Sequence, residues 1–214
     1  MEFIDPALDN YALTHSEKES ELLNSLNRET YLKVLQPRML SGHLQGRVLS
    51  MFSKMISTEC ILEIGTYTGY SALCLAEGLS SNGVLHTIEK NEELEPMITK
   101  YIDQSERKEA IRLHFGNALD VIKELSIRPD LVFIDADKTN YLNYYEAVLP
   151  NMKSGGFLIA DNVLWSGKVL DEEERKADPD TLALHEFNER VTKDDRVENV
   201  LLPIRDGLMV IRKK

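Results

Sequence analysis

Asp130-Leu-Val-Phe-Ile-Asp135-Ala-Asp137-Lys138 and Phe157-Leu-Ile-Ala-Asp161-Asn162 are two apolar runs that end in polar side chains. Continuous apolar runs are typical of buried strands in a parallel sheet. Ligands of open α/β sheets bind beyond the carboxyl ends of such strands. Because carboxylate and amide oxygens suit Mg²⁺, Mn²⁺ or Ca²⁺ better than zinc, Asp135, Asp161 and Asn162 predict a divalent-metal site. Two surface loops with helix-capping side chains are the alternative.

Strand-like and helix-like segments alternate around these two runs. Apolar runs predict five strands, at 59–64, 83–89, 110–115, 131–135 and 156–160. Helical spacing predicts helices between them, at 70–79, 92–105, 118–125 and 141–149. This order predicts an α/β fold with a doubly wound, mostly parallel sheet and right-handed crossovers.

The C-terminal part follows a different pattern. A helix is predicted at 181–191, and two strands at 197–203 and 207–212 flank the turn dipeptide Asp206-Gly207. Such a turn between apolar runs predicts an antiparallel hairpin, which brings the sheet to seven strands. The segment 164–180 is the most loop-like, and its acidic run at 171–174 indicates a solvated face or a helix start. A lid over the site is an alternative for this segment.

The first 56 residues are predicted to be helical and to lie outside the sheet. A charged amphipathic helix is expected at 16–34, and a second helix carries an apolar stripe that should face the core, made of Leu44, Val48, Met51, Phe52 and Met55. A chain of 214 residues suits one domain. We therefore expect a single domain, with N-terminal helices over the site at 1–56 and an α/β core at 57–214.

Charge and hydropathy limit the partners and the cellular location that we expect for the protein. The chain carries 36 acidic and 25 basic residues, a net charge of −11, which repels nucleic acid and anionic membranes. No apolar run reaches the length of a membrane span. The first six residues lack the basic and apolar regions of a signal peptide, so we expect a cytoplasmic protein.

The first predicted strand leads into Glu63-Ile-Gly65-Thr66-Tyr67-Thr-Gly69-Tyr-Ser71. Glycine lets the backbone approach a ligand, and the N-terminus of the next helix offers free N–H groups. Tyr67 interrupts the dinucleotide pattern G-x-G-x-x-G, which argues against NAD. Glu89 ends the second strand, at the position where an acidic side chain accepts hydrogen bonds from ribose hydroxyls. A surface glutamate at a helix start is the alternative.

Five blocks together resemble the class I S-adenosylmethionine-dependent O-methyltransferases. The resemblance is to the metal-dependent group that includes caffeoyl-CoA and catechol O-methyltransferases. The blocks are Met39-Leu-Ser41, 62–71, Thr87-Ile-Glu89, Asp135-Ala-Asp-Lys138 with Tyr141, and Ala160-Asp-Asn162 with Leu164-Trp165. The closing segment 202–207 also looks like the caffeoyl-CoA type. The match covers nearly the whole chain in order, and its paired metal blocks are specific to this group.

The resemblance implies a Rossmann-like methyltransferase fold and assigns roles to individual residues. It implies that Asp135, Asp161 and Asn162 bind a divalent cation, usually Mg²⁺, and that Lys138 is the catalytic base beside Asp135. Trp165 and Ser166 fall near the acceptor. The implied contacts of S-adenosylmethionine are Ser41, Glu63, Gly65, Thr66, Tyr67, Ser71, Glu89, Ala118, Asp135 and Asp137.

The implied chemistry sets a condition on Lys138. A lysine has an ordinary pKa of about 10.4, so a nearby dication and burial must lower it before the amine can take a proton. A solvated lysine at a helix start is the alternative, although a cation there opposes the helix dipole.

Several functions stay open. We expect methyl transfer to a small vicinal-diol aromatic of the catechol, caffeic acid or caffeoyl-CoA type. Plant caffeoyl-CoA enzymes have Asn where this chain has Ser166. A hydroxylated uridine in tRNA is an alternative acceptor if Lys33, Arg38, Arg47 and Lys54 gather at the site mouth. A non-catalytic or NAD-binding module is the remote alternative. A homodimer is also expected, since C₂ dimers are the commonest assemblies.

Overall fold

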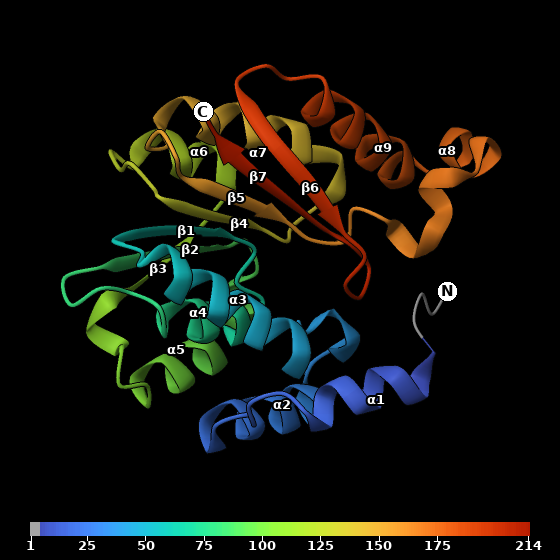
Figure 1. Cartoon of the computed structure of the whole chain (residues 1–214). Helices are drawn as coiled ribbons and strands as arrows, with labels where there is room; N and C mark the ends of the chain where they lie inside the picture. The colour runs from blue at the N-terminus through green and yellow to red at the C-terminus, as the bar shows by residue number, and fades with distance from the viewer. Residues whose placement is uncertain (1–4) are drawn as a thin grey trace.

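A seven-stranded sheet forms the centre of the protein, in the order β3-β2-β1-β4-β5-β7-β6. The computed structural model describes residues 5–214; residues 1–4, on which the signal-peptide prediction partly rests, lie outside the described residues. Strands β1 to β5 pair in parallel, whereas β7 is antiparallel to both β5 and β6. The predicted fold class, a mostly parallel sheet with a C-terminal antiparallel hairpin, is confirmed (Figure 1).

The strands form where the apolar runs predict them. Their bounds are β1 Cys60–Ile64, β2 Val84–Glu89, β3 Ile111–Phe115, β4 Leu131–Ile134, β5 Phe157–Ala160, β6 Val197–Leu202 and β7 Leu208–Lys213. All of β4 is buried, as expected for a central strand with helices over both faces. Along β1, Ile61 packs into one core, while Leu62 and Ile64 pack into the core on the opposite face.

Helices cover both faces of the sheet (Figure 1). One layer contains α3 (Gly42–Ile56), α4 (Tyr70–Ala76) and α5 (Glu95–Asp103), with α1 (Pro6–Thr14) and α2 (Glu21–Lys33) outside it. The other contains α6 (Ala118–Glu124), α7 (Tyr141–Val148) and α9 (Pro179–Thr192). Short helices complete the chain: η1 Pro37–Met39, η2 Glu92–Leu94, η3 Lys108–Ala110, η4 Lys138–Asn140, η5 Leu149–Asn151, η6 Trp165–Leu170 and α8 Glu172–Ala177. None of the helices within residues 5–214 has the length and apolar character to cross a membrane.

Two helical segments differ from the prediction. The helix expected at 16–34 begins only at Glu21, where the Ser20 hydroxyl accepts a hydrogen bond from the N–H of Leu23 at 3.2 Å. α1 precedes it, within the region predicted to be helical, although no separate helix was delimited there. The expected loop at 164–180 holds η6 and α8, and Asp171 caps α8 by accepting from the N–H of Glu173 at 2.8 Å. The capping side chains therefore fix boundaries that periodicity alone does not reveal.

Helix α3 only partly follows the predicted orientation. Leu44, Val48 and Phe52 are half-buried, and Val48 and Phe52 pack against the core, but Met51 is 58% and Met55 74% exposed. The buried residues of α3 are Gln45, Gly46, Leu49, Ser50 and Ser53. A Cβ on Gly46 would lie 2.7 Å from Cε1 of Tyr70, so glycine permits close packing of α3 on α4. The prediction was wrong for Met51 and Met55, because the most buried face of α3 carries small and polar residues that allow close helix packing.

Candidate active site

The pairing register places four predicted site residues in one row. Ile64 at the end of β1 pairs with Ile88 of β2 and with Ile134 of β4, and Ile134 pairs with Ala160 of β5, so the residues that come next in each chain segment share one level. Gly65, Glu89, Asp135 and Asp161 belong to this carboxyl edge, with neighbouring strands about 4.8 Å apart. The strand order reverses at β1, which lies between β2 and β4. Such a reversal is where open α/β sheets bind their ligands.

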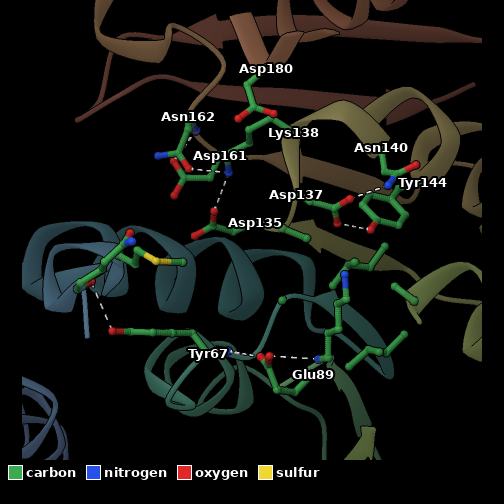
Figure 2. A pocket seen from close by; sticks show the side chains of 18 of the residues that line it. Tyr67, Glu89, Asp135, Asp137, Lys138, Asn140, Tyr144, Asp161, Asn162 and Asp180 are labelled. Carbon is green, nitrogen blue, oxygen red and sulfur yellow. Dashed lines mark hydrogen bonds and ion pairs between the residues drawn. The ribbon is translucent and has the colours of Figure 1, made fainter. Parts of the chain in front are cut away.

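A cavity of about 890 Å³ lies over this row. Its volume is in the range of small-molecule sites in proteins. It contains most of the side chains predicted to act, including Gly65, Tyr67, Glu89, Ala118, Asp135, Asp137, Lys138, Asp161, Asn162 and Trp165. Figure 2 shows Glu89 and Tyr67 at one end and Lys138, Asp161 and Asn162 at the other.

The glycine turn and Glu89 form the first end of the cavity. Gly65 has φ +98°, and a Cβ there would lie 2.0 Å from the carbonyl oxygen of Asp135, so no other residue fits. The N–H of Tyr67 donates to Oε2 of Glu89 at 2.7 Å. Oε1 of Glu89 accepts from the N–H groups of Lys90 and Asn91. The carboxylate is thereby fixed, and Oε2 keeps a lone pair that can accept from a hydroxyl group of a ligand.

A buried polar network lies under this turn. The hydroxyl of Thr87 donates to Oε2 of Glu63 at 2.5 Å and contacts the hydroxyl of Thr66. Burial raises the pKa of Glu63 to about 8. Four predicted cofactor residues are buried and stand behind the cavity lining, namely Ser41, Glu63, Thr66 and Ser71. Glu63 and Thr66 flank the turn at Gly65, and their contacts with Thr87 hold the chain on both sides of it.

Lys138 joins the predicted metal ligands at the other end. Its Nζ donates to Oδ1 of Asp135 at 2.9 Å and to Oδ1 of Asn162 at 2.8 Å. A third bond, 2.7 Å long, runs to the hydroxyl of Tyr141, which donates to the backbone oxygen of Asp161. Oxygens from the ends of β4 and β5 therefore converge on one positive charge (Figure 2).

Burial and the charged groups of this cluster shift the pKa values of its side chains. Burial and, second to it, the nearby carboxylate of Asp135 raise the pKa of Asp161 to about 7. Burial disfavours the charged form of Lys138, but the oxygens of Tyr141 and Asp135 outweigh it and raise the pKa of Lys138. Lys138 is thus an ammonium here. The lowered pKa that a base requires depends on a neighbouring dication.

The donor set fits a hard cation. Two carboxylates and one amide oxygen are ligands that Mg²⁺, Mn²⁺ and Ca²⁺ prefer. Within residues 5–214 no group of three or more His, Cys, Asp or Glu side chains is arranged to hold a metal, so a site here needs Asn162. Asn162 has φ +60°, in the left-handed region that asparagine adopts more readily than most residues. The ammonium of Lys138 already lies against oxygens of two of these three side chains, Asp135 and Asn162.

Asp137 is held between the two ends of the cavity. The hydroxyl of Tyr144 donates to its Oδ1 at 2.5 Å, and the side-chain amide of Asn140 donates to its Oδ2. Burial raises the pKa of Asp137, but these donors outweigh it and the pKa is lowered. Tyr144 and Asn140 also line the cavity and were not predicted. Their signal in the sequence is weak: polar residues one and two turns after Asp137.

The acceptor side of the cavity is only partly predicted. Trp165 lines it, and its Nε1 donates to Oδ2 of Asp178 at 3.3 Å. Ser166 is exposed and stands off the lining; its N–H donates to Asp206. Other lining residues come from distant segments and were missed as contacts, among them Gln36, Met39, Asp180 and Arg205. Met39 and Arg205 lie in segments that carry the family resemblance, but no contact was assigned to them, because only tertiary packing brings these residues together.

These features define a class of protein before any comparison. A parallel sheet with a closing antiparallel hairpin, a glycine turn beside an acidic strand end, and an oxygen cluster in the same cavity are features of a methyltransferase-type α/β enzyme. Residues 13–214 match the family model Methyltransf_3, described as O-methyltransferase. The chain belongs to this O-methyltransferase family.

Relatives agree with this assignment. The chain is 33% identical over 206 residues to caffeoyl-CoA O-methyltransferase 1 of Zea mays, covering 92% of this chain and 80% of the relative. It is also 33% identical over 214 residues to catechol O-methyltransferase domain-containing protein 1 of Mus musculus, covering 98% of this chain and 80% of the relative.

Solved structures show the same fold with cofactor bound. TomG, an O-methyltransferase of Streptomyces achromogenes in complex with SAM, superposes with a TM-score of 0.90 at 25% identity, covering 97% of this chain and 96% of that one. An O-methyltransferase of Bacillus cereus in complex with SAH has a TM-score of 0.87 at 28% identity, with 97% of each chain covered. The prediction of an S-adenosylmethionine-dependent O-methyltransferase is confirmed.

Proposed function

We propose that this enzyme methylates one hydroxyl of a small vicinal-diol aromatic and uses a divalent cation held by Asp135, Asp161 and Asn162. One observation carries the proposal: oxygens of Asp135 and Asn162 bind the same positive charge, the Nζ of Lys138, inside the cavity that contains Glu89. A site that groups hard oxygens around a cation beside the donor pocket suits an acceptor with two adjacent oxygens.

The two ends of the cavity have separate tasks. Glu89 and the Gly65 turn bind the adenosine part of the methyl donor, because Oε2 of Glu89 offers a fixed lone pair to a ribose hydroxyl. Ala118 and Asp137 also line the cavity and are proposed to contact the methyl donor. Trp165 forms part of the acceptor wall.

The reaction requires a deprotonated acceptor oxygen. When bound, Mg²⁺ supplies a positive charge that lowers the pKa of a hydroxyl beside it and of the Lys138 ammonium. Neutral Lys138 then takes the hydroxyl proton. The phenolate oxygen bonds to the methyl carbon while the carbon–sulfur bond breaks, which gives a methyl ether and S-adenosylhomocysteine. Correct placement of the two reactants contributes roughly 7–11 kcal/mol to such a reaction.

Labelled S-adenosylmethionine tests the proposal. Catechol, caffeic acid and caffeoyl-CoA are offered to metal-stripped enzyme with and without Mg²⁺, and phenol serves as the acceptor with one hydroxyl. We expect transfer to at least one diol, loss with EDTA, recovery with Mg²⁺, and no transfer to phenol. The proposal is wrong if none of the diols is methylated in a metal-dependent way.

The basic residues give little support to a tRNA acceptor. Lys33 pairs with Glu29 at 2.8 Å, and Arg47 and Lys54 both pair with Glu77. Of the four cations considered in the sequence, Arg38 alone lines the described cavity. Tight, salt-sensitive tRNA binding would restore this alternative.

The homodimer stays a prediction. The outer face of α3, where Met51 and Met55 are exposed, is the surface on which we expect a second copy to pack. Sedimentation equilibrium should give twice the chain mass for the native protein, and Met51→Glu with Met55→Glu should give the monomer mass. A monomeric native protein contradicts the expectation.

A further inference from the structure

Gln45 connects helix α3 to the end of β5. It lies on the inner face of α3 and is fully buried. Its Nε2 donates to Oδ2 of Asp161 at 2.5 Å. Its Oε1 accepts from Nη1 of Arg205 at 3.0 Å, and the same Nη1 donates to the backbone oxygen of Leu40 at 3.2 Å. A continuous path of hydrogen bonds thus runs from the β6–β7 turn through α3 to Asp161.

Arg205 determines which way the Gln45 amide faces. A guanidinium can only donate, so the amide must turn its oxygen toward Arg205 and its NH₂ toward Asp161. Asp161 then has one donor on each carboxylate oxygen, because its Oδ1 accepts from the N–H of Asn162 at 2.7 Å. Two donors on opposite oxygens fix the plane of a carboxylate that is only 2% exposed.

We propose that Gln45, oriented by Arg205, is a positioning residue that holds the Asp161 carboxylate in the orientation for binding a divalent cation. This inference rests on the proposed metal-dependent function. Side chains that hydrogen-bond a metal ligand set its direction, and their loss typically weakens metal binding 10- to 100-fold. The role is separate from binding the methyl donor, which uses the Glu89 end of the cavity.

Mn²⁺ binding to the full chain measures this role directly. Free Mn²⁺ is followed by electron paramagnetic resonance in the presence of saturating S-adenosylhomocysteine. Gln45→Met keeps the length of the side chain but cannot donate a hydrogen bond, and we expect about 10- to 100-fold weaker Mn²⁺ binding. Arg205→Met leaves the amide in place but frees it to flip, so we expect a smaller, several-fold loss. S-adenosylhomocysteine affinity should change less than about two-fold in both variants.

Ser50→Ala is the matched control. Ser50 lies on the same buried face of α3, and its hydroxyl donates to Glu77 at 2.7 Å, so the variant also removes a polar contact of that face. We expect native Mn²⁺ affinity for Ser50→Ala. An equal loss in this control would show that α3 acts only as general support, and would overturn the inference.

The other possible results also test the positioning role of Gln45. Native Mn²⁺ affinity in both Gln45→Met and Arg205→Met overturns the positioning role while leaving the metal site intact. Absence of Mn²⁺ binding to the native enzyme overturns the metal-dependent function itself, and the inference with it. If Gln45→Met does not fold, Arg205→Met at its exposed position decides alone, and native affinity there overturns the inference.

Discussion

The two ends of the cavity are built in different ways. The donor end uses a short stretch of chain, in which the Gly65 turn follows β1 and Glu89 is the last residue of the adjacent strand β2. The acceptor end combines η1, the ends of β4 and β5, η6 and the β6–β7 turn, which lie far apart in the sequence. Donor recognition is therefore a local property of the chain. Acceptor recognition depends on tertiary packing, so it can change without disturbing the donor end.

Asp161→Ala should give the largest difference between the acceptor end and the donor end of the cavity. It removes one proposed cation ligand and leaves the Glu89 corner intact. Because a bound cation is worth several kcal/mol of transition-state stabilisation, we expect roughly a 10³-fold loss of kcat with catechol-type acceptors. Rate assays combined with calorimetric titration of S-adenosylhomocysteine measure both ends.

At the donor end, we expect Asp161→Ala to bind S-adenosylhomocysteine with the affinity of the native protein. If Asp161→Ala weakened S-adenosylhomocysteine binding as much as turnover, the two ends would not be independent.

Glu89→Gln should produce the reverse pattern. The substitution removes a charged acceptor of ribose hydroxyls and disturbs the backbone N–H groups that it binds. Hydrogen bonds to charged groups are worth about 1.5–3 kcal/mol, so we expect roughly 10- to 100-fold weaker S-adenosylhomocysteine binding. Mn²⁺ affinity should stay native, and a comparable loss of Mn²⁺ binding would contradict the division.

The position of the donor end and of the proposed metal ligands could be predicted from the sequence because each lies at the end of an apolar strand. Strand ends align once the sheet is parallel, so Glu89, Asp135 and Asp161 had to share one edge. Gln45 and Arg205 could not be found in this way. Their contacts depend on how α3 and the hairpin turn pack, and no periodicity in the sequence encodes that packing.

Glu63→Gln tests how the buried network beside the Gly65 turn contributes to the pH dependence of folding stability. Burial raises the pKa of Glu63 from 4.5 to about 8, so the folded protein keeps a proton that the unfolded chain has released in this range. The stabilisation is complete below the unfolded pKa and is lost as pH rises through about 8.

Glu63→Gln removes this dependence, because an amide does not titrate. Between pH 5 and 8.5, urea unfolding should show the native protein losing roughly 1 kcal/mol or more relative to the variant. Parallel stability curves for the two proteins would show that Glu63 does not take up a proton on folding.

Ser166→Asn should have the smallest effect. The sequence assigned Ser166 to the acceptor, but the side chain is exposed and stands off the lining of the cavity. We expect less than about a two-fold change in KM for a small diol, in keeping with the usual effect of surface substitutions. A larger change would extend the acceptor end to include η6 beyond Trp165.

Helix α3 shows a second limit of sequence reasoning. An apolar stripe at helical spacing predicts a buried face, yet Met51 and Met55 face outward while Gly46 and Gln45 face inward. The polar side chain of Gln45 belongs inside because Asp161 and Arg205 satisfy it. Burial of a polar residue depends on its partners, which a single helix cannot reveal.

Anomalous diffraction from crystals grown with Mn²⁺ and S-adenosylhomocysteine tests the central claim most directly. We predict one strong manganese peak bound by oxygens of Asp135, Asp161 and Asn162, with the Nζ of Lys138 moved out of its present contacts with Asp135 and Asn162. The claim is contradicted if S-adenosylhomocysteine occupies the Glu89 end while no manganese lies among these three side chains and Lys138 keeps its present contacts.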